Sequence, residues 1–99
     1  MTQLNIITDD QQKKQKVDAL LKQALDRESG IIKAALERTL ANLAAFETKY
    51  SKTSDEFFRQ YEVGETDDSA DSVDWAGEYR IYLSLREQSN ALKDLVVCK

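Results

Sequence analysis

The sequence has no histidine, no proline and a single cysteine, and these absences exclude several classes of function. Histidine is the side chain that most often acts as a general base near neutral pH and as a metal ligand. Without it, neither a Ser–His nor a Cys–His catalytic pair can be assembled. One cysteine, Cys98, can form neither an intramolecular disulfide nor a cysteine zinc site. We therefore expect a protein that is not an enzyme and that holds no metal or other cofactor.

Glycine and long apolar runs are also scarce. The three glycines stand at positions 30, 64 and 77, so no glycine-rich phosphate loop is present. No apolar run approaches the roughly 18 residues that span a bilayer, and the first residues do not read as a secretory signal. We therefore expect a soluble, cytoplasmic protein with no membrane partner. A chain of 99 residues without proline is typical of one small domain built from long helices.

The first half of the chain has the pattern of one long helix. Its apolar residues recur mostly at steps of three and four, which is the period of an amphipathic helix. They are Val17, Leu20, Leu21, Ala24, Leu25, Ile31, Ile32, Ala35, Leu36, Leu40, Leu43, Ala44 and Phe46. Because the pattern continues past Gly30, we expect a helix over 10–50, either straight or bent at that glycine. Residues 1–9 are expected to be a flexible or short-strand start.

The second half predicts a short helix, a loop and a second long helix. Thr53 and Glu56 match a capping box, so a helix is expected over 53–63, with Gly64 ending it. The polar and acidic stretch 64–72 reads as a loop, and Asp71 or Ser72 can cap a last helix over 73–97. The expected buried side of that helix comprises Trp75, Ala76, Tyr79, Tyr82, Leu83, Leu92, Leu95 and Val96.

These elements predict an all-α fold and a single helical domain over 1–99. The two long helices pack antiparallel, as a helical hairpin or bundle, with the short helix at the bend. An elongated hairpin leaves an apolar stripe exposed, and such a stripe requires a partner helix. We therefore expect a homo-oligomer.

Charge is concentrated in one interval. Between Arg59 and Arg80 there is no Lys or Arg, but there are seven acids: Glu62, Glu65, Asp67, Asp68, Asp71, Asp74 and Glu78. Three interpretations remain open: a solvated loop whose acids cap the next helix, a surface for a basic partner, or a weak divalent-cation site. Trp75 is likewise either a core residue, with a close helix approach at Gly77, or an anchor for another chain.

A whole-chain pattern resembles one group of proteins. The stretches that carry it are Ala24-Leu25-x-Arg27-Glu28, Ala35-Leu36-x-Arg38-Thr39, Phe46-Glu47-x-Lys49-Tyr50, Ser54-x-Glu56-Phe57, Tyr61-Glu62-x-Gly64-Glu65 and Asp71-x-x-Asp74-Trp75-Ala76-Gly77-Glu78. Together they resemble small, mostly helical proteins of cyanobacteria and other prokaryotes. Several of those are similar to the antitoxin member of two-gene toxin–antitoxin modules. The resemblance implies a helical fold and a protein partner encoded by a neighbouring gene.

The leading hypothesis is an antitoxin-like, protein-binding module that neutralises a small basic nuclease-type toxin through an acidic and aromatic surface. The residues expected at this surface are Phe57, Phe58, Tyr61, Glu62, Asp67, Asp68, Asp71, Asp74, Trp75 and Tyr79. The alternative is a helical dimerisation or scaffold protein that uses the stripe over 17–46. A third reading is a DNA-binding regulator in which Lys13, Lys14 and Lys16 contact phosphates.

Overall fold

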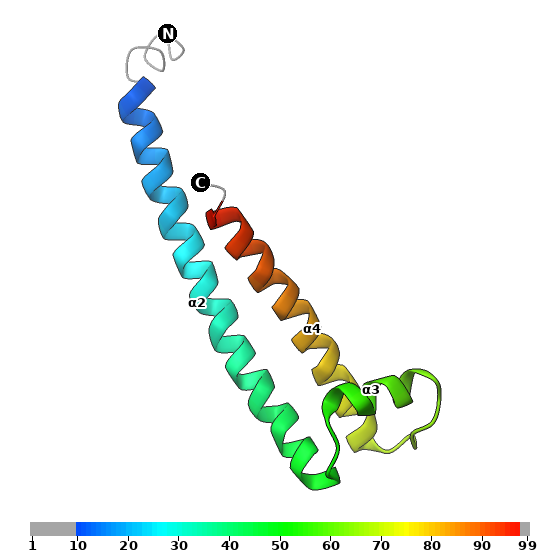
Figure 1. Cartoon of the computed structure of the whole chain (residues 1–99). Coiled ribbons are helices and arrows are strands. Elements are labelled where there is room, and N and C mark those ends of the chain that lie inside the picture. The colour runs from blue at the N-terminus through cyan, green and yellow to red at the C-terminus, as the bar shows by residue number, and fades with distance from the viewer. Residues whose placement is uncertain (1–9, 98–99) are drawn as a thin grey trace.

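The protein is a helical hairpin closed by a short helix at one end (Figure 1). The computed structural model describes residues 10–97, and the side chains of residues 10–95. Its elements are α2 (Asp10–Tyr50), α3 (Ser54–Glu62) and α4 (Ala70–Val97), and the described residues contain no strand. The predicted all-α class with two long packed helices is confirmed. The expectations for residues 1–9 and for Cys98 fall outside the described residues.

Helix α2 runs unbroken through Gly30 over 41 residues. At 1.5 Å per residue it is about 60 Å long, so its N-terminal part extends beyond the end of α4 (Figure 1). In this projecting part Val17 and Leu20 are 58% and 65% exposed. No helix between residues 10 and 97 is both long enough and apolar enough to cross a membrane.

The ends of α3 follow the predicted capping chemistry. Thr53 is extended (φ −73°, ψ 153°), and its Oγ1 accepts a hydrogen bond from the Glu56 amide at 3.1 Å. Glu47 of α2 adds a second cap, because its Oε2 accepts from the Ser54 amide at 2.9 Å. The chain leaves the helix through Gly64, which has φ +75° and donates its amide to the Tyr61 carbonyl at 3.1 Å. A glycine suits this left-handed conformation because it has no Cβ to clash.

Helix α4 begins at Ala70, three residues before the expected start at Val73. Ser69 is the cap, in place of the predicted Asp71 or Ser72, because its Oγ accepts from the Ser72 amide at 3.2 Å. Asp67 supports this cap: its Oδ1 accepts from the Ser69 amide at 3.1 Å and from the Ser72 hydroxyl at 2.6 Å. The acidic connection is therefore shorter than predicted, and Asp71 lies in the first turn of α4.

The core lies at the closed end of the hairpin. Its buried members are Leu43, Phe57, Phe58, Trp75 and Ala76. Trp75 is 2% exposed and stacks on Phe57 with ring centroids 4.0 Å apart. Its Nε1 donates to the buried Ser54 Oγ at 2.9 Å, so the polar end of the indole is satisfied. One tryptophan thus joins all three helices, because Phe46 of α2 stacks on it as well.

Candidate functional site

The aromatic part of the predicted binding surface is largely inside the protein. Phe57, Phe58 and Trp75 are 4%, 9% and 2% exposed, because their rings pack against one another and against α2. The structure thus places these three as core residues and not as surface anchors. Tyr61 and Tyr79 are half-buried at the edge of the same cluster. A partner at this end can contact the two tyrosines without opening the core.

Asp71, also predicted as a binding residue, joins the two long helices. It accepts a hydrogen bond from Lys49 Nζ at 2.7 Å and another from the Tyr50 hydroxyl. These donors hold the pKa of Asp71 below its ordinary value, Lys49 first and Tyr50 second. In return, the hydrogen bond to Asp71 raises the pKa of Lys49 and that of Tyr50. The charge of Asp71 is therefore neutralised within the molecule, which leaves less of it for a partner.

Asp67 has a similar structural task in the cap of α4. The hydrogen bonds from Ser72 and then Ser69 lower its pKa, so the carboxylate is held in its charged form. Neither donor is charged, so the negative charge of Asp67 is not cancelled. The Asp67 side chain is exposed at the surface. It can cap the helix and still contribute to the surface potential.

Three further acids of this end have no such internal role. Glu62, Glu65 and Asp68 are exposed, and none forms a hydrogen bond or ion pair through its carboxylate among residues 10–97. We call these three and Asp67 the acidic loop. It spans 62–68, from the last residue of α3 into the connection to α4, at the closed end of the hairpin (Figure 1). Carboxylates without internal partners remain fully available to a basic partner.

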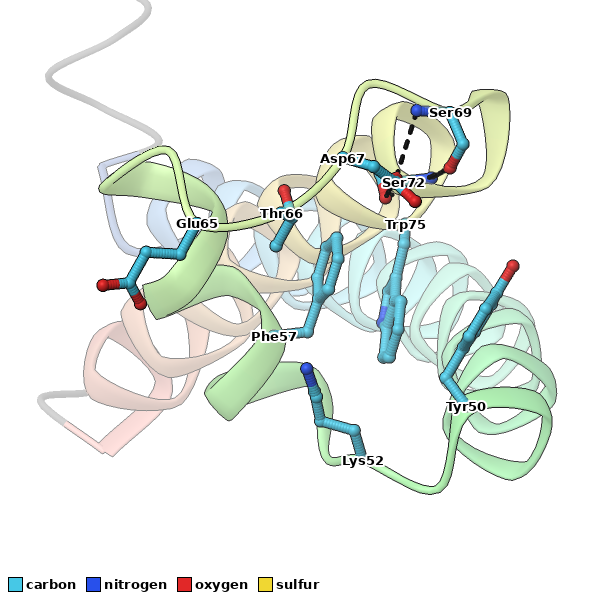
Figure 2. A pocket seen from close by; sticks show the side chains of 9 residues that line it. All are labelled: Tyr50, Lys52, Phe57, Glu65, Thr66, Asp67, Ser69, Ser72 and Trp75. Carbon is cyan, nitrogen blue, oxygen red and sulfur yellow. Dashed lines mark hydrogen bonds between the residues drawn. The ribbon is translucent and has the colours of Figure 1, made fainter.

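A small cavity lies between the acidic loop and the aromatic stack (Figure 2). Its volume is about 220 Å³, and its lining comprises Tyr50, Lys52, Phe57, Glu65, Thr66, Asp67, Ser69, Ser72 and Trp75. Ligand pockets usually measure at least about 300 Å³, so this one is too small for a typical cofactor. Lys52 Nζ already donates to Gln60 Oε1 at 2.6 Å. The sequence did not reveal this cavity, because its walls meet only after the helices pack.

The alternative of a metal site finds no support in the described chain. Within residues 10–97 no group of three or more histidine, cysteine, aspartate or glutamate side chains is placed to bind a metal ion. The acids of the interval 62–78 make different contacts: Asp71 joins two helices, Asp67 caps α4, and others are exposed in the acidic loop. They do not converge on one point.

The remaining predicted acid, Asp74, belongs to a different surface. It lines a shallow groove between α2 and α4 together with Asn42, Ala45, Phe46, Val73, Gly77, Glu78 and Ile81. A Cβ atom added to Gly77 would have no neighbour within 4 Å, apart from the backbone of its own helix. The prediction of a close helix approach at Gly77 is therefore wrong, because the glycine faces this open groove. None of its lining residues belongs to the cavity beside the acidic loop.

The predicted basic cluster lies at the other end of the molecule. Lys13, Lys14 and Lys16 are exposed on the first turns of α2, in the part that projects beyond α4 (Figure 1).

The chain matches no protein-family model, and no significant match was found among curated proteins or solved structures. The resemblance to antitoxin-like proteins therefore stays a prediction.

Proposed function

We propose that the chain is an antitoxin-like binding protein without catalytic activity of its own, and that its acidic loop covers a basic surface of a small nuclease-type toxin. The observation that carries this proposal is the set of exposed carboxylates of Glu62, Glu65 and Asp68, which have no partner among the described residues. A fold does not keep such a density of like charge for its own stability, because like charges repel.

The rigidity of the closed end also supports this function. The acidic loop is held on one side by the hydrogen bonds of the Gly64 and Glu65 amides to carbonyls in the last turn of α3, and on the other by the Ser69 cap of α4. Both helices pack on the buried Trp75 or contain it. A surface that is already ordered loses little conformational entropy when it binds. Its carboxylates would occupy the positions of RNA phosphates on the toxin, with Tyr61 and Tyr79 providing apolar contact at the rim.

Binding of this kind depends on charge, and it is therefore expected to weaken as salt is added. Exposed charges are screened over a Debye length of about 8 Å at physiological ionic strength. Electrostatic attraction of this type acts mainly on the association rate. A complex whose affinity is the same at low and high salt would contradict the role of the acidic loop.

The experiment is co-expression with the product of the neighbouring reading frame, followed by co-purification and a growth test. The test variant carries Glu62→Gln, Glu65→Gln and Asp68→Asn. The matched control carries Glu37→Gln, Glu87→Gln and Asp94→Asn, which remove the same charge from exposed positions outside the acidic loop. We expect the test variant to bind at least about 10-fold more weakly and to rescue growth poorly, and the control to behave as the wild type.

Two results would overturn the proposal. In one, the neighbouring product is harmless or does not bind the chain. In the other, both triple variants lose the same affinity, so that net charge rather than the acidic loop determines binding.

A further inference from the structure

One face of the hairpin exposes large apolar side chains from both long helices. On α2 these are Val17, Leu20 and Ile31, which are 58%, 65% and 58% exposed. On α4, Val73 and Ile81 are 52% and 50% exposed and line the groove around Gly77. Exposed apolar residues aligned on one face indicate an interaction surface, whereas single scattered ones do not.

The α2 residues on this face form a second seam beside the one that packs on α4. The seam steps by three and four residues in strict alternation, which places its members in one row along the helix. Its members are Val17, Leu20, Ala24, Arg27, Ile31, Ala34, Arg38, Ala41 and Ala45. The last of them, Ala45, lies in the groove with Gly77, so the row leads directly into that groove.

This seam is complementary to itself when a second copy runs antiparallel. With Ile31 placed on the two-fold axis, Val17 falls opposite Ala45, and Arg38 falls opposite Ala24. By the same symmetry, Leu20 falls opposite Asn42, next to Ala41, and Arg27 falls opposite Ala35, next to Ala34. Each large or long side chain of the seam thus meets an alanine directly or at the neighbouring position, and only Ile31 meets its own copy. Alternation of large and small residues is what close helix packing requires.

The charges favour the same orientation. Residues 47–78 of the closed end carry ten acids and three bases, whereas residues 10–27 carry five bases and three acids. Within one chain, the ion pair of Lys49 with Asp71 sets the register of α4 against α2. That register puts Asp74 at the level of Phe46, and hence opposite Lys16 of an antiparallel copy, with Lys14 two residues away. A parallel copy would instead place the acidic ends side by side.

We propose that the chain forms an antiparallel, two-fold homodimer in which the projecting part of α2 from each copy lies in the α2–α4 groove of the other. The seam from Val17 to Ala45 is about 42 Å long, and the hairpin is 22 Å wide. The face therefore offers at most roughly 900 Å², against the ~800 Å² per partner of a standard interface. This inference goes beyond the proposed function and does not depend on it.

The first test measures the mass of the full chain in solution by sedimentation equilibrium. Leu20→Glu is expected to raise the dimer dissociation constant at least about 30-fold, because a charge would enter the groove of the other copy. Leu40→Glu is the matched control, since Leu40 is 48% exposed but does not belong to the seam. It should dimerise as the wild type does. A wild-type chain that is monomeric at about 100 μM would overturn the proposal.

A second variant separates loss of the dimer from loss of the fold. A Cβ atom at position 77 has no neighbour within 4 Å in one chain, and it faces the open groove. Gly77→Leu also replaces a poor helix former, so the monomer should remain fully helical. In the dimer the same side chain would meet the incoming α2. We expect a helical monomer by circular dichroism and sedimentation. A Gly77→Leu protein that dimerises as strongly as the wild type would contradict the proposed groove.

The register is tested by disulfide formation in a Cys98→Ser background. Ile31→Cys should crosslink to its own copy under mild oxidation, because the two positions face each other across the axis within disulfide reach. Val17→Cys alone should not crosslink, but Val17→Cys with Ala45→Cys should. A strong crosslink from Val17→Cys alone would show a parallel dimer and overturn the proposal, as would the absence of any Ile31→Cys product.

Discussion

At the scale of single residues, Asp71 is the carboxylate that joins α4 to α2, through Lys49 and Tyr50. Its pKa is lowered in the folded state, so its stabilising effect is present above the ordinary aspartate pKa and is lost as the pH falls through the lower, folded value. The pKa values of Lys49 and Tyr50 are raised, so their effect is present below their ordinary values and is lost as the pH rises through the folded ones.

We therefore predict that Asp71→Asn flattens both the acid and the alkaline limb of the stability profile. The reason is that Asp71 is the largest cause of the raised pKa values of Lys49 and Tyr50 and is also the group whose own pKa they lower. Asp67→Asn is the control: its hydrogen-bond donors are hydroxyls and an amide that do not titrate in this range, so it should flatten only the acid limb. The measurement is the urea midpoint from circular dichroism across the pH range. An unchanged alkaline limb in Asp71→Asn would contradict the bridge.

Trp75 shows why the candidate site could be predicted only in part. The spacing of Trp75 and Tyr79 indicated a face of α4 but did not decide whether a partner or the protein itself covers it. That choice depends on Phe57 and on Ser54, whose hydroxyl accepts the indole hydrogen bond. Both residues come from another helix, so their position is set by tertiary packing. Glu62 and Asp68 are exposed, as the acidic composition of the loop predicts, because burying an unpaired carboxylate is unfavourable.

At the scale of elements, the signals that could be read from the sequence were the local ones. Thr53 and Glu56 lie within one turn, so the cap of α3 was predicted to the residue and the helix start to within one residue. The start of α4 was placed three residues late, since Ser69 became the cap only with help from Asp67. At Gly77 the sequence suggested a close approach, although open space surrounds it. A glycine within a helical pattern does not by itself reveal which side it faces.

Gly64, in the turn after α3, and Gly77, within α4, should respond in opposite directions to replacement by alanine. Gly64→Ala is expected to lower the free energy of unfolding by about 1–2 kcal/mol, because its φ of +75° disfavours a Cβ. Gly77→Ala is expected to raise it by about 1 kcal/mol in the monomeric Leu20→Glu chain, because alanine is the better helix former and nothing in one chain obstructs its methyl group. Urea unfolding of each variant beside its parent chain measures both effects. If Gly77→Ala lowered the free energy of unfolding instead, the methyl group would have to clash with a neighbouring group, which contradicts the open space around it.

At the scale of the whole molecule, packing decreases from the closed end to the open end. The aromatic core surrounds Trp75, and Ile32 is the buried apolar residue of α2 nearest the open end among the described residues. Beyond it, the projecting part of α2 packs on no other helix (Figure 1). Helical segments without tertiary packing are marginal in water, so in a single chain this part is expected to be less stable than the packed end.

This gradient predicts how backbone amides exchange with solvent. In Leu20→Glu, which should be monomeric, the amides of residues 12–24 are expected to exchange rapidly, and those of 39–46 and 75–83 close to the limit of global unfolding. In the wild type, protection of residues 12–24 should rise with protein concentration, because the dimer buries them. Leu40→Glu should retain this concentration dependence. If residues 12–24 were equally protected in Leu20→Glu and in the wild type at every concentration, α2 would be stable without a partner along its full length.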